Sequence, residues 1–169
     1  MKATQLLIFA VIALCSIGTV HAEDEAWYAG VKAGQIKIDK PGFENVIGVG
    51  GILGYKLSNT LGIEGGYTTT GKDGDVTVGA SLVKWDLDVV AVHLAYRTEG
   101  NFFAKGKAGL LYQEVSAKTS NANEPSSGGE LSIGVGVGWR PFKDIALEFE
   151  YTLIESDISF ISFNINLGI

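Results

Sequence analysis

Two carboxylates and two lysines at alternating positions are the residues of this sequence best suited to chemistry. Glu148 and Glu150 are separated by one residue, and so are Lys105 and Lys107. Paired carboxylates can act as a general acid and a general base, one donating a proton and the other accepting one. Beside lysines, the same carboxylates form ion pairs instead, because a buried charge persists only with a partner. Which of these two roles the carboxylates have depends on the elements that carry them, and we favour ion pairing over acid–base catalysis.

The other candidate sites are isolated motifs. His93 is the only histidine after His21, which leaves no set of ligands for zinc. The glycine-rich stretches 48–51 and 134–138 resemble a dinucleotide-binding loop, but neither opens a predicted helix, as that motif requires. Residues 72–75 match the start of a calcium-binding loop without its later glutamate. We therefore expect no enzyme activity, no cofactor and no bound metal.

Length and composition restrict the class of protein. The chain has 169 residues, which is enough for one domain, and it carries 23 glycines and a formal net charge of −6. A nucleic-acid-binding protein needs a clustered basic surface, so the acidic balance argues against that class of partner. A single cysteine excludes a disulfide scaffold.

The N-terminal 22 residues have the pattern of a secretory signal peptide. Lys2 precedes an apolar run from Leu6 to Val20, and Ala22 ends a small-residue cleavage site before an acidic segment. A transmembrane anchor would need a longer apolar run. Cys15 follows the bulky Leu14, which disfavours a lipoprotein signal. We expect residues 1–22 to be removed and residues 23–169 to form one domain, exported through the Sec pathway.

The exported part shows apolar residues alternating with glycine, polar or charged ones, which is the period of a β-strand. The pattern divides into eight segments of about ten residues, the usual length of a transmembrane β-strand. It has almost no helical periodicity. The predicted strands are residues 27–36, 46–57, 60–69, 82–97, 101–112, 130–140, 145–153 and 158–169.

The connections between these segments alternate in length. Three are short enough for hairpin turns and three are longer and polar, as in a barrel with short turns at one end and long loops at the other. The short connection at residues 155–157 is an exception. The short connections are residues 58–59, 98–100 and 141–144, and the long ones are residues 37–45, 70–81 and 113–129, the last with a Ser/Asn-rich run at 119–127.

Alternation alone fits both a soluble barrel with an apolar interior and a membrane barrel with an apolar exterior. The polar face decides, because it is rich in glycine, which weakens an exposed strand but makes room inside a narrow barrel. We therefore place the polar face inside. The parity of the strands then puts three lysines and three glutamates in the lumen, where we expect an ion-pair network: Lys32, Glu64, Lys105, Lys107, Glu148 and Glu150.

Aromatic residues near both ends of the apolar face support contact with lipid. Membrane barrels carry an aromatic girdle at each interface, whereas a soluble barrel buries such rings inside. The girdle expected near the short turns contains Trp27, Tyr55, Tyr96, Phe102 and Trp139, and the one near the long loops contains Tyr67, Tyr112 and Tyr151.

These features together resemble the OmpA-type family of small eight-stranded outer membrane β-barrels. The similar stretches are residues 27–34, 134–140, 146–151 and 163–169, within a resemblance that covers the whole exported part. The resemblance implies an all-β, antiparallel, up-and-down barrel in the outer membrane, assembled by the barrel-assembly machinery. In the family the last strand usually ends in Phe, where this chain has Ile169. No periplasmic peptidoglycan-binding domain is expected after it.

The function expected from these features is structural. We expect a monomer that contacts outer membrane lipid and lipopolysaccharide, has a filled lumen and presents polar external loops to an unknown ligand. A small pore is an alternative, although the lumen of eight strands is filled by side chains. An adhesin that contacts host or matrix is another, and it rests on analogy with relatives. Some relatives act on lipid A, but nothing near His93 in the sequence supplies the required Ser and carboxylate.

Overall fold

The computed structural model describes residues 26–40, 43–71, 74–78, 81–119 and 122–169. The expected signal peptide, residues 1–22, lies outside the described residues and stays a prediction. No helix in the described ranges is long and apolar enough to span a bilayer. The described strands are β1 (Trp27–Ile38), β2 (Val46–Lys56), β3 (Leu61–Thr70), β4 (Gly74–Val78), β5 (Ser81–Arg97), β6 (Phe102–Thr119), β7 (Ala122–Phe142), β8 (Ile145–Glu155) and β9 (Ile158–Gly168).

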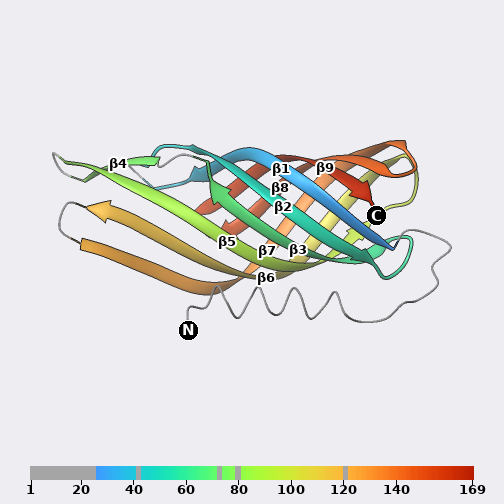
Figure 1. Ribbon diagram of the computed structural model, residues 1–169, viewed down its shortest axis with the longest axis horizontal. Helices are drawn as coiled ribbons and strands as arrows, with labels where there is room; N and C mark the ends of the chain where they lie inside the picture. The colour runs from blue at the N-terminus through green and yellow to red at the C-terminus, as the bar shows by residue number, and fades with distance from the viewer. Residues whose placement is uncertain (1–25, 41–42, 72–73, 79–80, 120–121) are drawn as a thin grey trace.

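Eight of these strands close into an antiparallel barrel. Each pairs with its neighbours in sequence, and β1 pairs with β9, while β3 pairs with β5 past the short strand β4. Every pairing is antiparallel. Because β1 pairs with β9 and β3 pairs with β5, every strand in the ring has a partner on both sides. Figure 1 shows the strands tilted around a common axis, with the C-terminus at one end. The predicted up-and-down eight-stranded barrel is confirmed.

The two ends of the barrel differ. At one end the chain turns tightly after β2, β5 and β7, and Gly100 in the β5–β6 turn has a φ of 106°, which favours glycine. At the opposite end β5, β6 and β7 extend beyond the rest of the barrel, and β4 pairs along β5 (Figure 1). A four-stranded sheet therefore projects from this end.

The prediction of a long loop at residues 113–129 is wrong. β6 and β7 remain paired as far as Thr119 and Ala122, so residues 113–119 and 122–129 are paired strands. Its polar composition suggested a loop, but strand pairing needs only backbone hydrogen bonds once the preceding residues are in register. Pro125 is tolerated because β7 begins to pair with β8 only at Ile133, which leaves this part of β7 as an edge strand. The predicted loop at residues 70–81 likewise contains β4.

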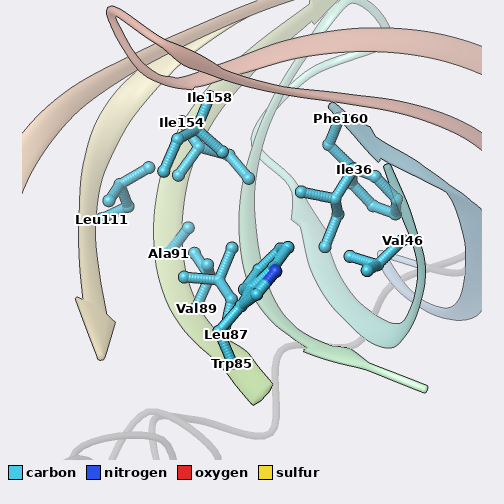
Figure 2. Close-up of a cluster of buried hydrophobic side chains, with 10 residues drawn as sticks. All are labelled: Ile36, Val46, Trp85, Leu87, Val89, Ala91, Leu111, Ile154, Ile158 and Phe160. Atoms are coloured by element: carbon cyan, nitrogen blue, oxygen red, sulfur yellow. The ribbon is translucent and has the colours of Figure 1, made fainter. Parts of the chain in front are cut away.

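The half of the lumen near the projecting sheet contains an apolar cluster that the sequence analysis did not anticipate. Its side chains point inward from six different strands, and Figure 2 shows them facing one another across the lumen. Trp85 and Leu87 are 1% exposed and Ile36 is fully buried. The cluster consists of Ile36, Val46, Trp85, Leu87, Val89, Ala91, Leu111, Ile154, Ile158 and Phe160.

Candidate functional site

The alternation of each strand separates a polar interior from an apolar exterior. Leu131 on the outside of β7 is 80% exposed, whereas Glu148 and Glu150 on the inside of β8 are each 1% exposed. A water-soluble protein would bury its apolar face and expose its charges. This barrel does the reverse along its middle, so its outer surface is suited to lipid and its charged side chains meet inside.

Lys105 lies at the centre of the interior charges. Its Nζ atom is 2.9 Å from Oε1 of Glu64 and 2.8 Å from Oε2 of Glu148, and it also pairs with Oε1 of Glu150. The lysine comes from β6, one glutamate from β3 and two from β8, so one ammonium group joins three strands across the lumen. Its side chain is 1% exposed. Such contacts satisfy charges that would be costly to bury alone.

Arg97 belongs to the same network, and the sequence analysis missed it. Its Nε atom donates to Oε1 of Glu148 at 2.8 Å, and Nη2 pairs with Glu64. Its Nη1 atom donates to the hydroxyl of Tyr28 at 3.0 Å, and that hydroxyl in turn donates to Oε1 of Glu64 at 2.7 Å. Arg97 ends β5, and the sequence analysis placed it at the end of the predicted strand 82–97 without assigning it to the lumen. Its spacing of four from the inward-facing His93 was the signal that could have identified it.

The remaining predicted lumen residues have different surroundings. Nζ of Lys107 is 2.8 Å from Oε2 of Glu150. Lys32 faces the lumen, but among the described residues no carboxylate lies within 4.0 Å of its Nζ atom, which is 5.7 Å from the centre of the Phe160 ring. The expected balance of three against three is therefore wrong. With Arg97 included, four cations face three carboxylates in this part of the lumen.

Glycines make room for these side chains, as predicted. A Cβ atom added at Gly134 would lie 2.7 Å from Cε of Lys107, and one at Gly136 would lie 3.0 Å from Cγ of Glu150. Both glycines are on β7, beside the charged strands β6 and β8. The glycine-rich strand thus accommodates the long side chains of its neighbours.

His93 forms a structural hydrogen bond in the lumen. Its Nε2 atom is 3.1 Å from Oγ of Ser132, whose hydroxyl donates to the carbonyl of Leu153 at 2.8 Å. Because the serine proton is already used, His93 donates to Ser132 and does not act as its base. An activated serine nucleophile needs the opposite arrangement. The described residues also contain no group of three His, Cys, Asp or Glu side chains that could hold a metal ion.

A hollow opens into the barrel at the short-turn end. It reaches inward to Arg97 and Glu148, and Arg140, Lys143 and Asn166 lie along its sides. The guanidinium of Arg140 stacks 4.3 Å from the centre of the Phe103 ring and donates to the carbonyl of Gly100 at 2.8 Å. The charged network therefore forms the floor of this hollow, and the apolar cluster lies beyond it.

The predicted girdle residues all have side chains on the outer face of the barrel. Near the short turns, Trp27 packs against Tyr55 with ring centres 4.9 Å apart, and Phe102 stacks on Trp139 at 6.0 Å. Tyr96 is 52% exposed beside them. These five residues lie close to the short-turn ends of their strands.

Tyr67, Tyr112 and Tyr151 lie farther along the barrel, and the hydroxyl of Tyr67 donates to Oδ1 of Asp88 at 2.7 Å. On β6, Tyr112 lies ten positions after Phe102. At about 3.3 Å per residue and a tilt of about 40°, this corresponds to about 25 Å along the barrel axis, the height of the apolar band of a membrane barrel.

A closed antiparallel barrel with an apolar exterior and charged interior defines the class of transmembrane β-barrels. A family model described as outer membrane protein beta-barrel domain matches residues 7–169. The chain therefore belongs to this family, and it is an outer membrane β-barrel protein.

Comparisons with individual proteins agree with this class. Outer membrane protein A of Salmonella typhi is 34% identical over an alignment of 92 residues that covers 47% of this chain and 26% of that protein. The matched region thus spans about a quarter of that relative.

Solved structures with the same fold include Neisserial surface protein A, with a TM-score of 0.69, 14% identity, and coverage of 88% of this chain and 100% of that one. The N-terminal barrel of Pseudomonas aeruginosa OprF has a TM-score of 0.60 and 12% identity, with 86% and 98% covered. Ail, the attachment invasion locus protein of Yersinia pestis, has a TM-score of 0.57 and 16% identity, with 85% and 97% covered.

Proposed function

We propose that the protein is a non-catalytic, monomeric barrel whose lumen stays closed while its projecting sheet faces the outside of the cell. The observation that carries this proposal is the filling of the lumen by two different layers in series. The layer near the short turns is the ionic network around Lys105, and the layer near the projecting sheet is the apolar cluster around Trp85. Eight strands leave little space that side chains cannot fill.

The two layers hinder ions in different ways. The ionic network would have to exchange its partners before an ion could pass, because each of its three carboxylates already contacts at least one buried cation. The apolar cluster excludes water, and an unwetted constriction is a barrier to ions. Breaking one layer leaves the other in place. This arrangement supports a closed barrel over the alternative of a small pore.

Conductance in planar lipid bilayers tests the proposal. We expect the folded wild-type protein to give no regular channel openings, and we expect the same from Lys105→Met and from Trp85→Ala alone. The double variant should conduct, because both layers are then weakened. Regular openings of the wild-type protein would support the pore. Folding of each variant is checked by heat-modifiable migration on gels, in which the folded barrel and the unfolded chain run differently.

The N-terminal segment, the last strand and the outer surface of the barrel suggest how the protein is exported, assembled and held in the membrane. We infer that residues 1–22 are removed during export and that the barrel-assembly machinery recognises β9, in which Phe163, Ile165 and Leu167 all point outward. The exposed apolar band would contact membrane lipid, with lipopolysaccharide around its outer edge. Cross-linking of the protein to the assembly machinery during export, and its loss in a Phe163→Asp variant, tests the role of β9.

A second candidate function, surface adhesion, is favoured by the projecting sheet. From Ala122 to Leu131, β7 pairs with β6 only, so its other edge presents backbone groups that an extended peptide could pair with. Ail, which shares the fold, is the attachment invasion locus protein of Yersinia pestis.

A shortened hairpin tests adhesion. Val115 and Ser126 are register partners, so removing residues 116–125 and joining these two by an Asn-Gly turn keeps the pairing below them. Loss of binding to cells or matrix by bacteria that carry this variant would support adhesion, and unchanged binding would reject this sheet as the adhesive element.

A further inference from the structure

We propose that the lumen binds one monovalent inorganic anion of halide size beside the ammonium group of Lys32. This site lies between the ionic network and the apolar cluster. The inference follows from the balance of interior charges, from the path of the Lys32 side chain and from the space around its end, and it does not depend on the proposed function.

The charges of the central lumen do not cancel. The carboxylates of Glu64, Glu148 and Glu150 are all engaged by cations other than Lys32: Arg97, Lys105 and Lys107. Lys32 is the cation left over, with no carboxylate among the described residues within 4.0 Å. The network thus reaches neutrality without Lys32, and one positive charge remains.

The side chain of Lys32 crosses the lumen over two glycines. Its Cε atom lies 3.0 Å from the position that a Cβ of Gly50 would take on β2, and its Nζ lies 3.4 Å from the corresponding position at Gly66 on β3. The ammonium group is therefore carried two strands away from β1. This path leads it over β3 and away from its own backbone.

The end of the Lys32 side chain lies beside a position at Gly66 that has few neighbours. Among the described residues other than its own chain neighbours, only Nζ of Lys32 and the carbonyl oxygen of Gly51, at 3.7 Å, lie within 4 Å of a Cβ position at Gly66. Lys32, Gly50 and Gly66 all face inward, yet each is only partly buried, whereas the neighbouring Gly48 and Gly54 are buried. The lumen is thus incompletely filled where the extra charge lies.

A small anion is the ligand that fits these conditions. The Phe160 ring, 5.7 Å from Nζ, offers only a weak cation–π contact, and beyond it the lumen is apolar. Because Lys32 is partly buried, its ammonium group has lost part of its hydration, and an opposite charge would offset that loss. A halide ion carries a single negative charge on a single atom, so it would provide this opposite charge within the space over Gly66. Its charge would also bring the central lumen to neutrality.

Thermal unfolding in detergent micelles tests the site. The midpoint for the wild-type protein is measured in sodium chloride and in sodium bromide against sodium gluconate at equal ionic strength. We expect the midpoint to rise saturably with either halide, because a ligand of the folded state stabilises it. Lys32→Met should lose this dependence, whereas Lys84→Met, which removes an exposed lysine from β5, should keep it.

A direct measurement complements the variants. Crystals of the wild-type protein grown in bromide should show an anomalous peak between Lys32 and Gly66. The proposal is overturned if the wild-type midpoint is the same in halide and gluconate, if Lys32→Met keeps the halide dependence, or if no bromide peak lies there. An uncharged Lys32 amine in contact with water would give the first of these results. Because the bromide experiment uses the unmodified chain, a variant that fails to fold does not prevent the test.

Discussion

Breaking the contact between Glu148 and Lys105 tests whether the interior charges act as one network. Glu148→Gln keeps the shape of the side chain and removes its charge. It leaves Lys105 with Glu64 and Glu150, and Arg97 with Glu64. Removing one partner of a buried ion pair costs about 3–5 kcal/mol, and the remaining carboxylates should keep this variant near the lower value, at about 3 kcal/mol.

Lys105→Met removes a cation that touches all three carboxylates, so we expect a loss near the upper value, about 5 kcal/mol. In the double variant both charges of the Glu148–Lys105 pair are absent, so neither is left without its partner. The combined loss should therefore be smaller than the sum by about 1–3 kcal/mol.

The assay is equilibrium unfolding in urea with lipid vesicles, followed by tryptophan fluorescence. Glu148→Gln with Lys84→Met is the control pair, because Lys84 is an exposed lysine outside the network, and its losses should add. Losses of Glu148→Gln and Lys105→Met that add to within about 0.5 kcal/mol would refute the coupling.

Three further predictions concern other parts of the barrel, each measured by the same unfolding assay. Val135→Arg should lower the free energy of unfolding by about 2–4 kcal/mol, because Val135 is 65% exposed on the lipid-facing side. Val135→Leu is the control and should cost little. If Val135→Arg were as stable as the wild-type protein, contact of this face with lipid would be contradicted. Gly138→Ala should cost about 1–3 kcal/mol because its methyl group would lie 2.2 Å from the Phe103 ring. Gly106→Ala should be neutral, because among the described residues other than the chain neighbours no atom lies within 4 Å of the added methyl group. Trp85→Ala should cost about 3–5 kcal/mol, and a loss below about 1 kcal/mol would mean that the apolar cluster is loosely packed.

The strands of the barrel could be predicted because their residues alternate so regularly. In β7, Leu131, Ile133, Val135 and Val137 point outward between small or polar residues, and this period of two specifies a strand with one apolar face. The same parity identified the inward positions of the charged residues on β3, β6 and β8. Once the glycine-rich face was placed inside, these positions followed from geometry alone.

The apolar cluster could not be predicted from alternation. In β5 the run Val89, Val90, Ala91 and Val92 is apolar on both faces, so parity gives no contrast between inside and outside there. The projecting hairpin was missed for a related reason, because its sequence is mostly polar and carries no periodic signal. Arg97 was missed because it precedes a turn, where a charge usually points to solvent.

Quenching of tryptophan fluorescence by brominated lipids tests the orientation of the barrel most directly. Trp139 is 44% exposed on the outer face and Trp85 is 1% exposed inside the lumen. In vesicles, a variant that keeps only Trp139 should be strongly quenched by bromine atoms near the interface, and a variant that keeps only Trp85 should not be. Strong quenching of Trp85 with none of Trp139 would contradict a lipid-facing apolar surface.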